Sequence, residues 1–138
     1  MFGQALSVSS SSGAPGDKVV LDISMDSQAG QAPAVLKWEL MFPARLLEID
    51  GSGPEPSKTA KESGKSLTCA VRAEYTFVCV LAGGEKPIAN GPIATFRFKI
   101  QASAHTGTSI IKIDQVDAVT KDLKTLKLSG AEGRVEIQ

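Results

Sequence analysis

This chain lacks both a long apolar stretch and a block of like charges. None of its apolar runs approaches the roughly 20 consecutive residues that a helix needs to cross a bilayer. The 15 basic and 15 acidic residues give a formal net charge of zero. Neither sign gathers into a patch that would attract nucleic acid or an anionic membrane. A partner must therefore be recognised by shape and local chemistry.

Residues suited to catalysis or cofactor binding are also scarce. The single histidine, His105, lies in a Ser/Thr/Gly-rich turn with no nucleophile or acid marked beside it, so the sequence predicts no enzyme. The glycines at 83–84 lack the helix and lysine of a phosphate-binding loop. Asp114, Asp117 and Asp122 do not follow the ligand spacing of an EF-hand loop. With no Cys-x-x-Cys pair either, we expect no metal and no other cofactor.

The chain does contain two adjoining apolar runs, at residues 67–81, with one cysteine in each. If residues 73–75 form the loop, the pattern predicts a β-hairpin in which Cys69 lies opposite Cys79. The residues expected to share the inward face of the cysteines are Leu67, Val71, Phe77 and Leu81. This hairpin is the element around which we expect the rest of the domain to pack.

The other face of the predicted hairpin is half apolar, which is unusual for a solvated surface. Its side chains are Thr68, Ala70, Arg72, Thr76, Val78 and Val80. One interpretation is a face that contacts a partner. The other is that Val78 and Val80 are present only because β-branched residues favour strands.

The opposed cysteines favour a disulfide, because the predicted pairing gives the placement that a bridge requires. Such a bridge would contribute about 3 kcal/mol by the chain-entropy estimate and would indicate an oxidising compartment. Two buried free thiols are the alternative. The first residues lack the charged and apolar segments of a secretory signal. Because a disulfide favours an oxidising compartment, we expect a secreted or cell-surface protein. Because no secretory signal is recognisable at the start, we expect its signal peptide to be absent from this sequence.

The remaining apolar residues alternate in short runs between turn residues, as in an all-β sandwich of about nine strands. Besides the hairpin, the expected strands are 5–9, 19–24, 35–42, 46–49, 92–101, 109–116, 123–128 and 134–137. Residues 10–12 are expected in a turn or a linker remnant, and residues 57–63 in one or two helical turns. The single tryptophan, Trp38, is assigned to the core. The length predicts a single domain over 1–138, with residues 1–4 disordered or vector-derived.

Three motifs follow one another along the chain. They are Gly13-x-Pro-Gly-Asp17 leading into Val19-x-Leu-x-Ile23, Trp38-x-Leu-x-Phe42-Pro43 followed by Leu47-Glu48, and Gly91-x-Ile-Ala-Thr-Phe96. Their order and spacing resemble the cohesin domains, the receptor modules of bacterial cellulosomes, over residues 5–137. The chain lacks the Asp usually found between Phe42 and Pro43 and carries an atypical cysteine pair. It is thus more similar to the divergent cohesin-like modules of bacterial surface and secreted proteins.

The resemblance implies a nine-stranded jelly-roll sandwich without catalytic activity. It also implies binding of a dockerin, a small calcium-loaded helical module of another protein, or of some other surface protein. The partner face would be the outer surface of the sheet formed by residues 35–42, 67–72, 76–81 and 109–116. Its outward side chains would be Lys37, Glu39, Met41, Thr68, Ala70, Arg72, Thr76, Val78, Val80, Lys112 and Asp114.

Two alternative functions stay open at this point. One is a carbohydrate-binding module on a similar sandwich, and the other is a structural spacer domain of a bacterial surface protein. Binding of a polysaccharide requires exposed flat rings for stacking. The chain offers Trp38, which is assigned to the core, and Tyr75 at the tip of the hairpin.

Overall fold

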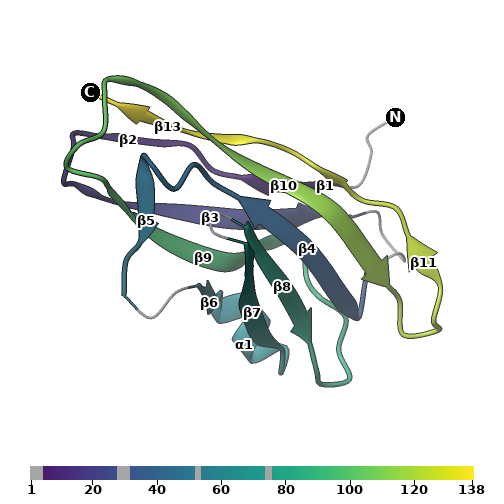
Figure 1. Cartoon of the computed structure of the whole chain (residues 1–138). Helices are drawn as coiled ribbons and strands as arrows, with labels where there is room; N and C mark the ends of the chain where they lie inside the picture. Colours follow the sequence, from purple (N-terminus) through teal and green to yellow (C-terminus); the bar gives the residue numbers. More distant parts are fainter. Residues whose placement is uncertain (1–4, 28–31, 52–53, 74–75) are drawn as a thin grey trace.

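The computed structural model describes residues 5–27, 32–51, 54–73 and 76–138, which form two β-sheets packed against each other (Figure 1). The six-stranded sheet has the order β12 (Ser129–Gly130), β1 (Ala5–Val8), β3 (Lys18–Asp26), β9 (Gly91–Ile100) and β5 (Leu47–Ile49), with β6 (Glu55–Pro56) paired to β9. The seven-stranded sheet has the order β2 (Ser11–Gly13), β13 (Gly133–Ile137), β10 (Gly107–Val119), β4 (Val35–Met41), β8 (Thr76–Ala82) and β7 (Ser66–Ala73), with β11 (Thr125–Leu126) paired to β10.

Alternating side chains of the two sheets meet in a hydrophobic core. In β3 the buried residues are Val19, Leu21, Ile23 and Met25. Trp38 of β4 is fully buried, and its position in the core is as predicted. The rings of Phe42 and Phe98 bring the two layers together, with ring centroids 5.1 Å apart. The predicted all-β sandwich is confirmed.

The described strands number thirteen, more than the nine or so predicted, because pieces of two or three residues also pair. Residues 10–12 were expected in a turn or linker, which is wrong for residues 11 and 12: they belong to β2, which pairs in parallel with β13. The expected strand at 123–128 is also wrong except at β11. Thr120 and Lys124 close a tight turn there, in which Leu123 has φ 65° and is 84% exposed. The expectation for residues 1–4 lies outside the described residues.

The single helix among the described residues is α1 (Lys58–Glu62), within the predicted helical segment. It begins after Ser57, whose side-chain oxygen accepts a hydrogen bond from the amide of Ala60 (3.0 Å), as an N-cap serine does. No helix in the described part of the chain is long and apolar enough to span a membrane.

Lys65 follows the helix and is buried, and its Nζ donates to the carbonyl of Ala34 (2.9 Å). Its removal from water lowers the pKa of the Lys65 ammonium.

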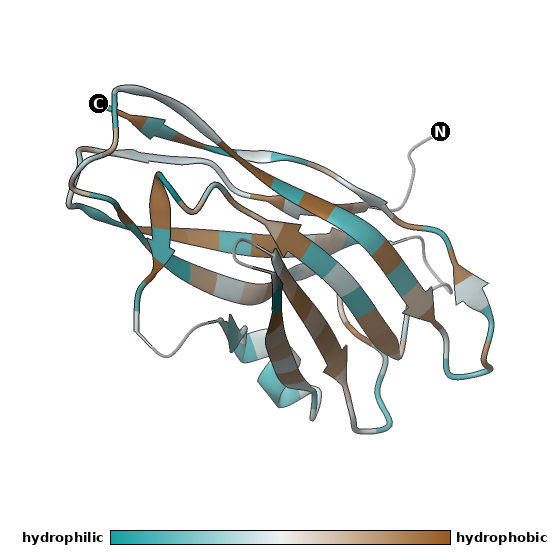
Figure 2. Cartoon of the chain, in the orientation of Figure 1, coloured by the Kyte–Doolittle hydropathy of each residue, from teal (hydrophilic) through white to brown (hydrophobic). Residues whose placement is uncertain are grey.

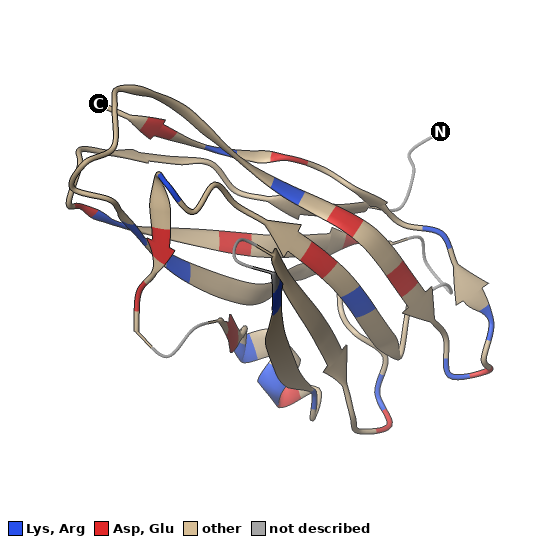
Figure 3. Ribbon diagram, in the orientation of Figure 1, with Lys and Arg blue, Asp and Glu red and all other residues tan. Residues whose placement is uncertain are grey.

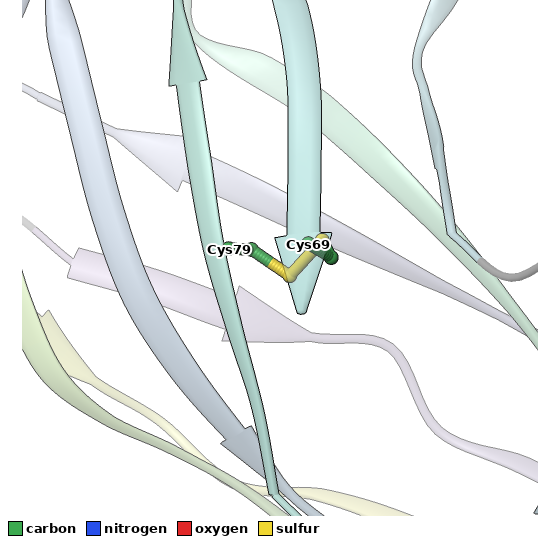
Figure 4. Close-up of a disulfide and its surroundings, with 2 residues drawn as sticks. All are labelled: Cys69 and Cys79. Atoms are coloured by element: carbon green, nitrogen blue, oxygen red, sulfur yellow. A yellow bond between two sulfur atoms is a disulfide. The ribbon is translucent and has the colours of Figure 1, made fainter. Parts of the chain in front are cut away.

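The predicted hairpin is formed by β7 and β8, which pair in antiparallel register with Cys69 opposite Cys79. The two residues are joined by a disulfide with an S–S distance of 2.10 Å, so the predicted bridge is confirmed (Figure 4). Part of the predicted loop, residues 74–75, lies outside the described residues. The assignment of Val71 to the core is wrong, because β7 is the last strand of its sheet and Val71 is 63% exposed. Leu67 on the same side is only half-buried.

Candidate functional site

Four adjacent strands, β10, β4, β8 and β7, form one end of the seven-stranded sheet. Their outward side chains lie in rows across the strands, because paired residues point to the same side of a sheet. We call this surface the outer face. Its rows are Asp117, Lys37, Val80 and Thr68; then Asp114, Glu39, Val78 and Ala70; then Lys112, Met41 and Thr76. Arg72 of β7 lies beside the last two rows at a shift in the β7 register.

The side chains of the outer face differ in how far water reaches them. The exposed ones are Lys37, Thr68, Ala70, Arg72, Lys112, Asp114 and Asp117. Met41, Val78 and Val80 are half-buried. Glu39 and Thr76 are buried, with 7% and 3% of their surface exposed. These two residues therefore have the expected outward orientation but are covered by their neighbours.

An ion pair at the middle of the outer face accounts for the burial of Glu39. The Arg72 guanidinium on β7 extends over β8 and donates from Nη1 to Oε2 of Glu39 on β4, at 2.8 Å. A carboxylate removed from water needs such a charged partner. The sequence placed both residues on this face but gave no sign of their pairing, since they are 33 positions apart and on strands that are not adjacent.

A β-bulge in β10 adds one residue to the outer face. The register with β4 shifts between Asp114 and Asp117, and Gln115 within the shift has φ 49°. The amide of Gln115 donates to Oδ1 of Asp114 at 2.8 Å. Strict alternation from Ile113 would turn Asp117 toward the core, but the bulge places it opposite Lys37 on the outside. A charged residue at an inward position was the signal in the sequence that could have indicated the bulge.

The outer face has a charged half, on β10 and β4, and an apolar half, on β8 and β7. Figure 3 shows Lys, Asp and Glu residues along β10 and β4, whereas β8 has no charged residue and β7 has only Arg72. In Figure 2 the hydrophobic colours are dense on β7 and β8. Since Arg72 and Glu39 pair with each other, the charges left for an outside partner lie on β10 and at Lys37. The arrangement suits a protein surface that is apolar on one side and polar on the other.

The comparisons with known proteins identify the family of the chain. The family model of the cohesin domain matches residues 4–137. The chain belongs to the cohesin family. Members of this family are non-enzymatic modules that bind other proteins. The search of curated proteins finds no match to this chain.

Solved cohesin structures share the fold. The sixth cohesin of scaffoldin B from Acetivibrio cellulolyticus, in complex with the Cel5 dockerin, is 16% identical with a TM-score of 0.84, over 99% of this chain and 100% of that one. The OlpC cohesin from Clostridium thermocellum, in complex with Doc435, is 17% identical with a TM-score of 0.84, over 100% and 95%. A non-cellulosomal cohesin from the archaeon Archaeoglobus fulgidus is 10% identical with a TM-score of 0.82, over 99% and 92%. At these identities the likeness establishes the fold.

Within the described residues, this cohesin domain brings no three His, Cys, Asp or Glu side chains together in a metal-binding arrangement. His105 lies exposed beside a hollow lined by Ala44, Arg45, Leu46, Gln101 and Ser103. That lining includes no carboxylate that could pair with the imidazole for acid and base catalysis. Asp122 lies exposed in the turn between β10 and β11.

The described aromatic rings of this cohesin domain lie mainly between the sheets. Trp38, Phe42, Phe96 and Phe98 are buried, and Phe77 is half-buried among them. Tyr75, which the sequence placed at the hairpin tip, is outside the described residues. The described surface therefore offers no open ring on which a sugar could stack.

Proposed function

We propose that this cohesin domain is a non-catalytic receptor module that binds a dockerin through its outer face. The observation that carries the proposal is the apolar half of that face. Val78 and Val80 are half-buried on β8 and point away from the core, beside exposed Ala70 and Thr68. Removal of the apolar surface that these side chains still expose to water would favour binding at an interface. The family assignment supports the class of partner.

The charged half of the outer face would set orientation and specificity. Lys37, Lys112 and Asp114 are exposed around the apolar half and are free to meet polar groups at the rim of an interface. Charges at a rim change association rates and exclude wrong partners more than they add affinity. Asp117, which the bulge brings to this face, belongs to the same group.

We further propose that the protein acts outside the cytoplasm, secreted or at the cell surface. The Cys69–Cys79 disulfide supports this, because such bridges persist in oxidising compartments. One structurally similar cohesin is part of scaffoldin B of Acetivibrio cellulolyticus. We propose that residues 1–138 act as a single domain in this setting.

A titration against dockerin modules tests the proposal. The panel contains the Cel5 dockerin and Doc435, which bind related cohesins, and dockerins encoded in the same genome as this chain. Val80→Asp places a charge in the apolar half and should weaken binding at least about 100-fold, a loss of the size seen when a central contact is removed. Val20→Asp is the matched control, because Val20 is 53% exposed on β3 of the other sheet. It should bind as the unchanged protein does.

Calorimetric binding and thermal unfolding of both variants are measured together. If no dockerin of the panel binds the unchanged protein, the proposed function is rejected. If Val20→Asp loses binding as Val80→Asp does, the outer face is not the site. If Val80→Asp unfolds, Val80 is a core residue and the assignment of the face is wrong.

A further inference from the structure

Strand β7 carries a quarter of the side chains of the outer face but is held weakly to the rest of the molecule. It is the end strand of its sheet, and β8 is its only ladder partner among the described residues. Of its inward side chains, Leu67 and Cys69 are half-buried and Val71 is 63% exposed. None of the three is fully buried, although Leu67 and Cys69 pack against the core, so hydrophobic burial fixes this strand less than it fixes β8 with its fully buried Cys79 and Leu81. Edge strands with few buried contacts are the parts of a sheet that open first.

Two side-chain links add to the β7 ladder. One is the ion pair from Arg72 to Glu39, whose guanidinium is largely exposed to water. The other is the Cys69–Cys79 disulfide, which joins the middle of β7 to β8. Cys79 is fully buried next to Trp38 in the register, whereas Cys69 is partly accessible on the edge strand. The covalent link thus joins a fully buried residue to a half-buried one on the edge strand, and Figure 4 shows the bridge between the two strands.

We propose that the Cys69–Cys79 disulfide is a redox switch of the outer face, closed when oxidised and open when reduced. The inference rests on the proposed function where it concerns dockerin affinity, and on β7 alone where it concerns conformation. When the bridge is intact, β7 holds Thr68, Ala70 and Arg72 in line with Val78 and Val80. When the bridge is open, β7 separates from β8 more often, and Thr68, Ala70 and Arg72 no longer stay in place on the outer face.

A dithiol reductant completes the chemistry of the switch. A thiolate of the dithiol attacks Sγ of Cys69, the less buried of the two residues, and the Cys79 sulfur leaves as a thiolate. The second thiol of the reductant then attacks the mixed disulfide and releases the sulfur of Cys69. The reductant ends as a disulfide, and the two cysteines end as thiols after taking up the two protons that the dithiol gave up. Two electrons pass from the dithiol to the protein bridge.

The ion pair couples the switch to the centre of the outer face. When β7 separates from β8, Arg72 moves away and the buried carboxylate of Glu39 loses its charged partner. An unpaired buried charge is unfavourable, so water must enter around the Glu39 carboxylate. Its entry changes the surface between Val78 and Asp114, which are the neighbours of Glu39 across the strands.

Hydrogen exchange followed by mass spectrometry tests the conformational part without any partner. The oxidised protein is compared with the protein reduced by dithiothreitol and with Cys69→Ser/Cys79→Ser, and thiol alkylation counts the open cysteines. Protection of the β7 amides should fall at least about tenfold on reduction, since the bridge restricts opening of the loop it closes. The amides of β3 and β9 should keep their protection. Dithiothreitol should not change the exchange of the doubly substituted variant, which is the control for the reagent.

Dockerin titration of the oxidised and reduced protein tests the functional part. Affinity should fall about tenfold or more on reduction, in step with the opening of β7. The switch is overturned if the two states bind dockerin with equal affinity or show equal protection of β7. It is also overturned if reduction lowers the protection of β3 and β9 as well, or if dithiothreitol does not open the bridge in the folded protein. If the oxidised protein binds no dockerin, the proposed function is rejected. The exchange data alone then decide whether the disulfide keeps β7 paired with β8.

Discussion

At the residue scale, the ion pair between Glu39 and Arg72 decides the character of the outer face. Glu39 lies on the central strand β4 and is 7% exposed, so its carboxylate depends on the guanidinium for compensation of its charge. Arg72 is on the solvent side and loses little hydration when it pairs. The pair therefore protects a buried charge more than it adds stability as a surface salt bridge would.

A double-mutant cycle measures this dependence. Arg72→Ala leaves the Glu39 carboxylate unpaired and should lower the free energy of unfolding by about 1–3 kcal/mol. Glu39→Gln in the Arg72→Ala background should recover part of that loss, because a neutral amide is less unfavourable to bury than an unpaired charge. Urea unfolding of the four proteins gives the coupling. Strictly additive effects would show that the two side chains do not depend on each other.

The sequence predicted the side on which a residue lies better than its exposure. Alternation in the strands placed Trp38, Cys79 and the valines of β8 on the correct sides, because the period of a strand is a local property. The exposure of Val71 and the burial of Thr76 depend on which other elements cover them. That information is not contained in the alternation of a single strand.

At the scale of the element, the bulge in β10 shapes the outer face as much as any side chain does. It turns Asp117 outward and returns Ala118 to the core, where it is fully buried. The positive φ of Gln115 is unfavourable for a residue with a side chain, and the Asp114 side chain compensates by accepting from the Gln115 amide. Bulges of this kind re-aim side chains at functional surfaces.

Glycine substitutions separate the bulge from the rest of β10. Gln115→Gly removes the strain of the left-handed backbone and should leave the free energy of unfolding unchanged or raise it by up to about 1 kcal/mol. Lys112→Gly, in the regular ladder of the same strand, should lower it by about 0.5–1 kcal/mol. Chemical denaturation of the two variants is sufficient. A loss at position 115 as large as that at 112 would argue against the bulge geometry.

The short strands mark the limit of prediction at this scale. The serine-rich segment of β2 has no apolar alternation, and it becomes a strand because its backbone pairs in parallel with β13, more than 100 positions later in the chain. In contrast, α1 carries its own signals in Ser57 and the helix formers that follow, and it was predicted. A strand that forms only by pairing with a distant segment need not show a strand pattern in its own residues.

At the scale of the whole molecule, topology came from the family resemblance and not from periodicity. The pattern of alternation predicts a sandwich, but it does not order β10 between β13 and β4. The last part of the chain links both layers, since β12 pairs with β1 in one sheet and β13 pairs with β10 in the other. Between them the chain runs close to the backbone of the opposite layer, and glycines stand at both ends of this crossing, at Gly130 and Gly133.

The close approach of the two layers at this crossing predicts that a larger residue at Gly130 or Gly133 would destabilise the fold. A Cβ atom on Gly130 would clash with the carbonyl of Ile113, and one on Gly133 would lie 2.7 Å from Cβ of Val8, so neither position has room without a shift of the sheets. Gly130→Ala should lower the free energy of unfolding by at least about 2 kcal/mol, as overpacking against rigid backbone does. Gly13→Ala is the matched control, because its nearest neighbour is the flexible end of Ile100 at 3.1 Å, and it should lose under about 1 kcal/mol. Calorimetric unfolding compares the two, and a loss below about 1 kcal/mol for Gly130→Ala as well would contradict the close packing of the two layers at this crossing.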